Sequence, residues 1–353
     1  MSVDENLSNE LVWEALQYEQ IGSAASNGSL KNDSFSEDAW LEPVKTAAVV
    51  PVSPDSVDGD IDGNGQADVV LAITRASHAD YGASGAWLIQ SNQTAVWGDL
   101  SKLGNSAIVL GIGRTSSGKE TSDVYVYDTA AKWLGAWVTD SNGAYSSLEG
   151  INQFNANMNV LGLGDFNGDG QSDVLLRSDT GDVGCWFTSG TNGWNYFQSL
   201  GNEWDLVAVG DFNNDGRDDV VLTNANGGFA GCWLTNADGT VSWASLDLLN
   251  GAVVVGAGDF NNDGTDDVLL KKGNYYGAWI VQNGNASAFM GLGTLEEGAV
   301  VEQVADFDGN GTDDLRIRKG DDIGALLVKG EDNLEWHYYG SVGSEWSTSL
   351  ASI

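Results

Sequence analysis

One short aspartate-rich segment recurs along the chain and limits its possible folds more than any other feature. Its five copies are GDIDGNGQADVVL from Gly59, GDFNGDGQSDVLL from Gly164, GDFNNDGRDDVVL from Gly210, GDFNNDGTDDVLL from Gly258 and ADFDGNGTDDLRI from Ala305. The last three spacings between the leading aspartates are 46, 48 and 47 residues, and the first is 105, about two periods. A sixth copy fits that gap, where LGIGRTSSGKETSDVYVY from Leu110 keeps the hydrophobic flanks and has lost the acids. A fixed period of this length predicts a repeat fold.

Two further elements keep the phase of the repeat. A small-residue and tryptophan unit follows each loop, at Gly85-Ala86-Trp87, Gly135-Ala136-Trp137, Gly184-Cys185-Trp186, Gly231-Cys232-Trp233 and Gly277-Ala278-Trp279, with Gly324-Ala325-Leu326 in the last copy. An aromatic residue comes next, at Trp97, Tyr145, Trp194, Trp243, Phe289 and Trp336. Short β-branched and aromatic runs between turn residues indicate four strands per copy. Four strands per repeat predict an all-β fold, a β-propeller of four-stranded blades, with a β-solenoid as the structural alternative.

The number of blades stays open between six and seven. Six copies lie between about Lys45 and Val342, inside a predicted propeller over residues 45–353. The segment GSEW before Ser347 resembles GNEW before Asp205, so Ser347–Ile353 is predicted as an innermost strand. Residues 1–44 are predicted as an extension and linker. Within it, LVWEALQYEQIGS either supplies outer strands of a composite seventh blade or forms a short amphipathic helix.

The repeated loop has oxygen-bearing residues at alternate positions, in the pattern Asp-x-Asn/Asp-x-Asp/Asn-Gly-x-x-Asp. Calcium requires such hard oxygen ligands, and the glycine permits a tight turn. An EF-hand would place a glutamate at position 12, where Leu176 stands instead, so the loop is predicted to enter a strand. The predicted ligands at positions 1, 3, 5, 7 and 9, the seventh through its backbone carbonyl, are Asp60, Asp62, Asn64, Gln66 and Asp68; Asp165, Asn167, Asp169, Gln171 and Asp173; Asp211, Asn213, Asp215, Arg217 and Asp219; Asp259, Asn261, Asp263, Thr265 and Asp267; and Asp306, Asp308, Asn310, Thr312 and Asp314.

The sequence therefore predicts about five Ca²⁺ sites. Asp-Gly turns are also ordinary hairpin chemistry, but five loops in one register favour metal over turn chemistry alone. Magnesium fits less well because it keeps more of its water. The sixth copy has Arg114 at position 1 and Lys119 inside the loop. Since a cation there repels calcium, no metal is predicted in that copy.

Composition excludes several classes of partner. Fifteen Lys and Arg against 51 Asp and Glu give a net charge of -36, which disfavours nucleic acid and anionic membranes. No apolar run approaches the length of a membrane span, and the N-terminus lacks the pattern of a signal peptide. Cys185 and Cys232 occupy a slot that holds alanine in the four other copies. They are predicted to be small buried residues that form no disulfide.

The GDFNGDGxxDV segments resemble FG-GAP and VCBS-type repeats, the calcium-loop blades of integrin α-subunit propellers, some fungal lectins and large bacterial surface proteins. DVLLRSDTGDVGCWF is most similar to the bacterial versions. The resemblance spans about Val44 to Val342, and the acid-free copy and Leu326 depart from it. It implies a secreted or cell-surface protein that works in display, adhesion or glycan recognition.

Three functions remain open at this point. The first is a calcium-stabilised binding or adhesion module whose ligand is a glycan or a surface protein. The second is a structural display domain of a larger surface protein. The third, a polysaccharide-degrading enzyme, is disfavoured because the repeated acids serve metal and only His78 and His337 are available as histidine bases. Most tryptophans lie at repeat positions, so blade packing explains them, whereas Trp13, Trp40 and Trp133 are the better candidates for a surface role.

Overall fold

The computed structural model describes residues 59–73, 78–104, 106–190, 193–224 and 228–347. Residues Ala47–Ile353 form one compact unit, and the strands described below belong to it. The strands or helix predicted near the N-terminus lie outside the described residues. No helix in the described ranges is long and apolar enough to cross a membrane.

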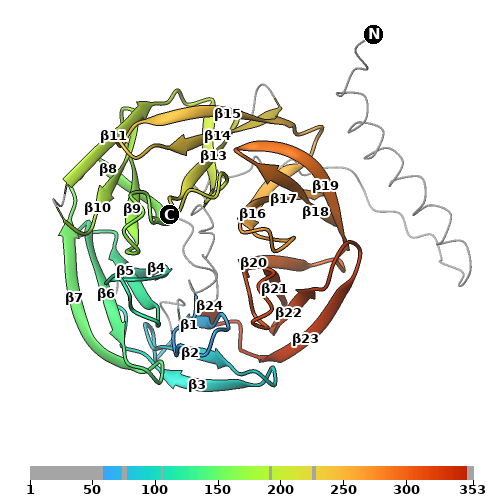
Figure 1. Cartoon of the computed structure of the whole chain (residues 1–353). Helices are drawn as coiled ribbons and strands as arrows, with labels where there is room; N and C mark the ends of the chain where they lie inside the picture. Colours follow the sequence, from blue (N-terminus) through green and yellow to red (C-terminus); the bar gives the residue numbers. More distant parts are fainter. Residues whose placement is uncertain (1–58, 74–77, 105, 191–192, 225–227, 348–353) are drawn as a thin grey trace, which may run out of the picture. The chain divides into compact units, whose positions relative to one another are not determined.

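Twenty-four strands form six antiparallel sheets of four strands, arranged as the blades of a β-propeller (Figure 1). In blades 1, 2, 5 and 6 the first strand lies nearest the centre of the ring and the fourth at its rim (Figure 1). Blade 1 consists of β24 (Trp346–Ser347), β1 (Val69–Ile73), β2 (Ser84–Ile89) and β3 (Ala95–Asp99). Blade 2 consists of β4 (Ala107–Gly113), β5 (Asp123–Asp128), β6 (Trp133–Thr139) and β7 (Tyr145–Gln153). Blade 3 consists of β8 (Met158–Gly164), β9 (Asp173–Ser178), β10 (Asp182–Phe187) and β11 (Gly193–Ser199).

The other three blades repeat this order. Blade 4 consists of β12 (Trp204–Gly210), β13 (Asp219–Asn224), β14 (Phe229–Thr235) and β15 (Val241–Leu248). Blade 5 consists of β16 (Val253–Gly258), β17 (Asp267–Lys272), β18 (Tyr275–Gln282) and β19 (Asn285–Thr294). Blade 6 consists of β20 (Ala299–Ala305), β21 (Asp314–Lys319), β22 (Asp322–Val328) and β23 (Leu334–Ser341). The prediction of an all-β propeller with four-stranded blades is confirmed.

The tail of the described chain closes the ring at blade 1. Trp346 and Ser347 of β24 pair with Ile73 and Ala72 of β1 in the first copy, and of the predicted innermost strand only Ser347 lies among the described residues. No composite seventh blade forms among the described residues. Ring closure explains the difference, because the first copy would otherwise leave the inner edge of β1 unpaired.

The core lies between neighbouring blades. One hydrophobic cluster joins Phe166, Val183 and Cys185 of blade 3 to Leu206 and Trp233 of blade 4. The second strands are buried almost along their whole length because both of their faces meet other sheets. Cys185 and the equivalent Cys232 are buried and free, as predicted.

The glycine of each Gly-x-Trp unit is required by close packing. A Cβ on Gly231 would lie 2.1 Å from the Trp243 ring, which rests directly on the backbone of β14. Blade 2 departs from the predicted pattern, since Leu148 and not Tyr145 stands opposite Trp137. Trp133 covers the glycine there instead, with its ring 2.3 Å from the Cβ position of Gly135. Trp133 is therefore partly buried by blade packing, and the surface role suggested for it stays a prediction.

Candidate functional site

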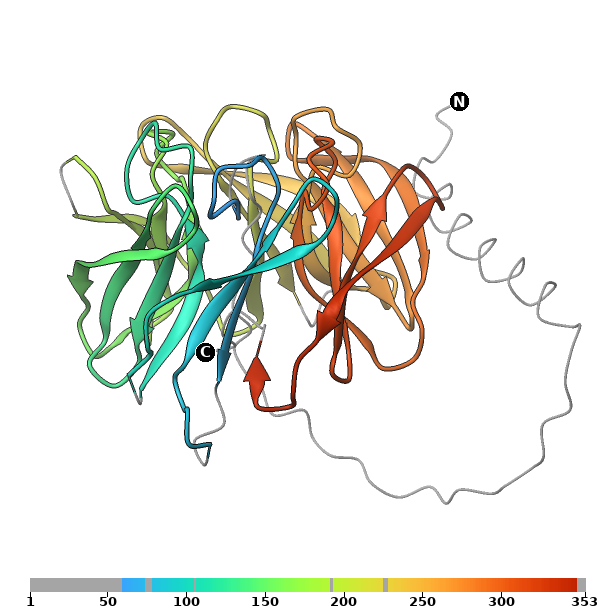
Figure 2. The same ribbon diagram turned by 90° about the horizontal axis from the view of Figure 1, so that it is seen from below.

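The acidic loops of blades 3 to 6 join the first strand of the blade to its second strand, and the loop of blade 1 leads into β1, the second strand of its blade. Equivalent connections lie at the same end of a propeller, so all of these loops gather at the upper end of the molecule in Figure 2. In blades 3 to 6 the loop begins where a buried inner strand ends, for example at Gly210 before Asp211. Each ends at the aspartate that opens or immediately precedes a buried second strand, as Asp219 does.

The position-1 aspartate organises the turn of each loop. One oxygen of Asp165 accepts backbone N–H groups of Gly168 at 2.8 Å and Asp169 at 3.1 Å, and the other accepts that of Gly170 at 2.7 Å. The same position-6 bond, from 2.6 to 2.7 Å, recurs at Asp60, Asp211, Asp259 and Asp306. The glycine donor takes a positive φ, of 80° at Gly170, which a side chain would strain. Loop geometry is thus set by the residues that the motif predicts.

The position-9 aspartate fastens the loop to the third strand of its own blade. Asp219 accepts the N–H of Phe212 at 3.1 Å with one oxygen and that of Thr235 at 2.7 Å with the other. Equivalent bonds to the third-strand segment are made by Asp68, Asp123, Asp173, Asp267 and Asp314. The side chain is buried in all six blades. This aspartate therefore holds the blade together whether or not a metal is bound.

Two loops bring three carboxylates within reach of one ion. In blade 1, carboxylate oxygens of Asp60, Asp62 and Asp68 lie within 4.8 Å of one another. In blade 6, carboxylate oxygens of Asp306, Asp308 and Asp314 lie equally close together. Hard, anionic oxygen donors at this spacing suit calcium.

Buried ligand atoms without hydrogen-bond partners give a second test of fit. Asn167 Oδ1 and Asp173 Oδ2 in blade 3, and Asp308 Oδ1 in blade 6, are buried and accept no hydrogen bond among the described residues. A buried acceptor left unpaired costs about 1–3 kcal/mol, and more when it is charged. All three belong to predicted ligand positions, so the residues present fit a bound cation.

Electrostatics in the loops favour a cation as well. Burial raises the pKa of Asp173, Asp267 and Asp314 to about 8, and the charges of neighbouring aspartates add to the shift. Burial likewise raises the pKa of Asp68 and Asp219 well above the ordinary range. A divalent ion among these oxygens would reverse this preference for the protonated form.

Blade 2 carries an internal cation in place of acidic ligands. The Lys119 ammonium donates to Asp123 Oδ1, and Asp123 is fully buried while the Lys119 side chain is 20% exposed. Thr115 Oγ1 donates to the other Asp123 oxygen at 2.5 Å. The expectation that this copy has lost its acids is wrong at position 9, where Asp123 is kept. Asp123 is retained because it pins Thr139 N–H at 2.9 Å, as its counterparts pin their own third strands.

Position 7 stays a prediction as a backbone ligand. The Gln66 side chain donates to the Phe307 carbonyl at 3.0 Å, and the Arg217 guanidinium pairs with Asp215 at 3.0 Å. Both side chains thus have partners of their own, which agrees with a position that contributes only its carbonyl oxygen.

Position 8, which the motif leaves unspecified, links each loop to the loop of the preceding blade. Its N–H donates to the carbonyl of the preceding position 1 at all six junctions: Ser122 to Asp60 at 2.7 Å, and Ser172 to Arg114, Asp218 to Asp165, Asp266 to Asp211, Asp313 to Asp259 and Ala67 to Asp306, each at 2.9 Å. These bonds form a closed ring of loops, which we call the loop ring. Any ion held by one position-1 aspartate is therefore one hydrogen bond away from the next loop.

Most position-8 side chains add a second bond at the same junction. Oδ2 of Asp218, Asp266 and Asp313 accepts the N–H of the preceding position-1 aspartate at 2.6, 2.8 and 2.9 Å. Ser172 Oγ accepts from Arg114 at 3.0 Å in the same way. Recurrence of Asp or Ser at this position was the available signal, but its partner lies in another copy and cannot be identified from spacing.

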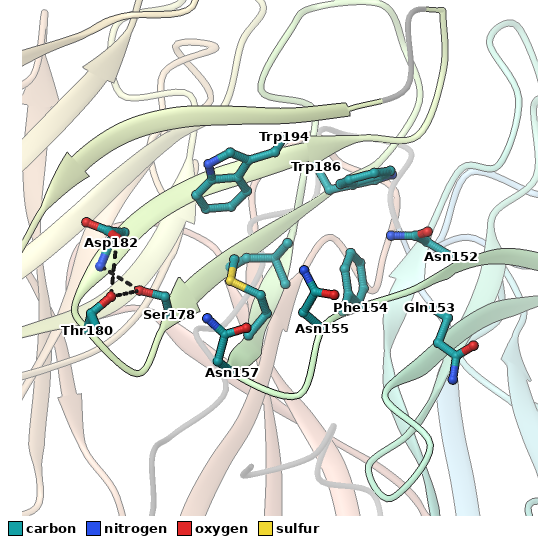
Figure 3. Close-up of a pocket in the computed structure, with 12 residues that line it drawn as sticks. Asn152, Gln153, Phe154, Asn155, Asn157, Ser178, Thr180, Asp182, Trp186 and Trp194 are labelled. Atoms are coloured by element: carbon teal, nitrogen blue, oxygen red, sulfur yellow. Dashed lines mark hydrogen bonds between the residues drawn. The ribbon is translucent and has the colours of Figure 1, made fainter.

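Two open clefts lie on the side of the blades, away from the loops. The blade-3 pocket has a volume of about 420 Å³ and is lined by the end of β7, the segment that leads into β8, and strands β9 to β11. The blade-6 pocket has a volume of about 540 Å³ and occupies the equivalent place on β19 to β23. Figure 3 shows the indole rings of Trp186 and Trp194 along one side of the blade-3 pocket, facing Asn155 and Asn157. Neither pocket was predicted from the sequence.

Comparison with known proteins agrees with the fold. The family model described as FG-GAP-like repeat matches residues 165–222 and 211–270, which span blades 3 to 5 and three of the acidic loops. The search of the curated proteins finds no match.

Solved structures show the same architecture at low identity. A lectin of Agrocybe aegerita, described as specifically recognising non-reducing terminal N-acetylglucosamine, is 14% identical with a TM-score of 0.50, over 78% of this chain and 76% of the lectin. A luciferin-regenerating enzyme is 12% identical with a TM-score of 0.46, over 84% and 94% of the two chains. A calcium-binding protein of Agrobacterium tumefaciens, regucalcin, is 13% identical with a TM-score of 0.42, over 67% and 77%. At these identities the likeness concerns the fold alone.

Proposed function

Because the chain is a β-propeller built from FG-GAP-like repeats, we propose that it is a calcium-stabilised, non-catalytic binding module that acts outside the cell and recognises glycans. The carrying observation is the geometry of the five acidic loops, with carboxylates of blades 1 and 6 within 4.8 Å of one another. Positions 1, 3, 5, 7 and 9 of each loop would hold the ion. When bound, Ca²⁺ supplies the positive charge that lets these carboxylates stay ionised together.

The position of the loops argues for a structural use of calcium. In blades 3 to 6 each acidic loop ties the first, second and third strands of its own blade, and the loop ring ties every loop to the next blade. At about ten times the dissociation constant, one site stabilises the fold by about 1.4 kcal/mol. Five such sites are comparable with the roughly 5–15 kcal/mol net stability of an ordinary domain.

The proposed location outside the cell is supported by the calcium affinity expected of such loops. Sites of the extracellular class bind calcium at about 10⁻⁴–10⁻³ M. Such sites fill only where calcium is millimolar, which is the case outside cells. The excess of acidic residues also keeps the module away from nucleic acid and anionic lipid.

A glycan ligand is supported by the aromatic residues that the propeller exposes. The indoles of Trp97, Trp194, Trp243 and Trp336 are 38–49% exposed on the fourth strands. Flat aromatic rings at a polar surface pack against the C–H faces of sugars. A surface protein is the alternative ligand. The absence of catalysis is part of the proposal, because the repeated aspartates are used by the loops and His78 lies beside the exposed Asp80.

The experiment has a metal step and a ligand step. Equilibrium dialysis of the full chain should find about five calcium ions per molecule, and EGTA should lower the melting temperature reversibly. A glycan array in millimolar calcium should show binding that EGTA abolishes. An unchanged melting temperature after EGTA would rule out the stabilising calcium, and an array without any signal would favour a structural display domain.

A further inference from the structure

The two pockets have a common origin in what covers the Gly-x-Trp unit of each blade. Two register positions lie over this unit: the residue at the start of the innermost strand and the residue at the start of the third strand. In blade 4 both are aromatic, and Trp204 packs edge-on against Phe229 at 5.4 Å and Trp243 at 5.5 Å. That blade has no cavity among those described.

Aromatic residues cover the unit in three other blades as well. In blade 1, Trp346 at the start of β24 packs edge-on against Trp97 at 5.6 Å. In blade 2, Trp133 at the start of β6 lies over Gly135. In blade 5, the Tyr275 hydroxyl at the start of β18 lies 2.5 Å from the Cβ position of Gly291, the residue that pairs with Gly277 of the unit.

Blades 3 and 6 have no aromatic residue at either position. Met158, paired with Ser178, takes the place of Trp204, and Asp182 takes the place of Phe229. In blade 6 the corresponding residues are Ala299, paired with Lys319, and Asp322. The two pockets lie in the space that an aromatic ring fills in the other blades. The pockets therefore arise from specific residue choices in two blades that lie opposite each other in the ring (Figure 1).

Both pockets preserve the same chain of polar groups. In blade 3, Tyr196 and Ser199 share a hydrogen bond of 3.2 Å, and Ser199 donates to Asp182. In blade 6, Tyr338, Ser341 and Asp322 repeat this arrangement. The acid that replaces the covering aromatic is thus held in a fixed orientation in both blades.

The blade-3 pocket is amphipathic and almost free of charge. Trp186, Trp194 and the buried Phe154 supply aromatic surface, with Trp186 and Phe154 edge-on at 5.9 Å. The facing wall carries the amides of Asn152, Asn155 and Asn157, whose side chains make no hydrogen bond to any residue described. Figure 3 shows the one acid, Asp182, beside Thr180 and Ser178, and Asp182 Oδ2 accepts from Thr180 at 3.2 Å.

The blade-6 pocket differs in charge. Lys319 and Glu296, which form an ion pair, replace Ser178 and Asn155, and Leu295 and Leu326 replace Phe154 and Trp186. A neutral, hydroxyl-rich ligand that needs aromatic faces and uncharged amides is therefore matched by blade 3 and not by blade 6.

We propose that the blade-3 pocket binds an uncharged saccharide, with one pyranose ring packed on Trp194 and its hydroxyl groups paired with Asn155 and Asn157. The volume of about 420 Å³ lies within the usual range of about 300–1,000 Å³ for ligand sites. Amide groups both donate and accept, which suits sugar hydroxyls. This inference rests on the proposed glycan-binding function and names the site and the ligand class.

The test fills the pocket with tryptophan, the residue that stands at the start of the innermost strand in blades 1 and 4. Met158→Trp places a tryptophan at the register position of Trp204 and Trp346, where the fold accommodates it. Ala299→Trp fills the blade-6 pocket by the same change and serves as the matched control. Trp194→Ala and Asn155→Ala remove proposed contacts, and Asn155 is exposed, so its replacement leaves folding intact.

Binding of a panel of neutral oligosaccharides to the full chain, in saturating calcium, is measured by saturation-transfer NMR and calorimetry. Met158→Trp and Trp194→Ala should abolish measurable binding, and Asn155→Ala should weaken it by about three- to tenfold. Ala299→Trp should leave the affinity unchanged. Calcium-dependent melting of every variant is recorded alongside, so that failure of the calcium proposal is seen separately.

Three outcomes would overturn the assignment. One is calcium binding and stabilisation without binding of any saccharide in the panel. Another is saccharide binding that persists in Met158→Trp. The third is tighter binding of choline, a quaternary amine, than of any neutral sugar, which would assign the aromatic wall to a cation.

Discussion

Lys119 and Asp123 form an ion pair inside blade 2, at the place where the other blades gather acidic side chains around a predicted metal position. The carboxylate is fully buried and would lie without a countercharge if the ammonium were absent. In this blade the lysine side chain thus supplies the positive charge for the buried carboxylate, a role that we propose for a bound calcium ion in the other five blades. For this reason we predict that the blade does not depend on calcium.

Lys119→Met should lower the free energy of unfolding by about 3 kcal/mol, in calcium and in EGTA alike. Loss of one member of a buried pair costs about 3–5 kcal/mol, and the partial exposure of Lys119 places the effect at the lower end. Urea unfolding under both conditions measures it.

Lys329→Met is the matched comparison, because Lys329 pairs with Asp308 of the blade-6 loop. It should increase calcium affinity by removing a competing cation. Equal calcium dependence of the two variants would contradict the assignment of Lys119 as the substitute for a metal.

Asp266→Ala should destabilise the propeller by about 1–3 kcal/mol, because it leaves the buried N–H of Asp211 without its 2.8 Å partner. Asp266→Ser should lose less, since serine serves at the equivalent junction through Ser172. Chemical denaturation in saturating calcium compares the two. Equal losses would show that the side-chain bond to the preceding blade contributes nothing.

Without calcium, the stability of the folded chain should fall as the pH rises from about 4 to about 8 and should level off above that. The folded-state pKa of Asp173, Asp267 and Asp314 is about 8, against about 3.9 in an unfolded chain. The folded protein therefore holds protons that the unfolded chain releases, and this stabilisation is lost as the pH passes the folded pKa.

Calcium should change the sign of that dependence, since the ion competes with protons for the same oxygens. Melting temperatures across this pH range, measured in EGTA and in millimolar calcium, should diverge at alkaline pH. Parallel curves would contradict the placement of calcium among these carboxylates.

Cys185 and Cys232 should resist thiol reagents in the native protein. Both are buried, and burial raises the pKa of each thiol above its ordinary value, so little thiolate forms. Ellman's reagent should react with neither in the native state and with both in guanidinium chloride. Rapid reaction of either thiol in the native state would show that a blade opens locally.

The sequence alone was sufficient for features that repeat within one copy. Strand number, the acidic loops and the buried cysteines could be predicted because each is set by neighbours close in the chain. Junction residues such as Asp266 could not, since their partners lie in other copies. The pairing of Trp137 with Leu148 depends on strand register, which a spacing of aromatic residues does not fix. Calcium binding itself stays a prediction.

The pocket-forming residues illustrate the same limit. Met158 and Ala299 look like ordinary hydrophobic residues in the sequence, and only alignment of paired strands reveals that tryptophan occupies their position elsewhere. A cavity forms where a large side chain is absent from a packed layer, and the residues adjacent in the sequence do not reveal such an absence.

The two-residue strand β24 has a consequence for the order in which the protein matures. Strands β1 to β3 of blade 1 are synthesised first. Its innermost strand, β24, emerges from the ribosome only after the five other blades have been made. Until then β1 presents an open edge that another chain could pair with. Trp346 and Ser347 therefore act as a latch, and a nascent chain has no closed ring until its synthesis reaches them.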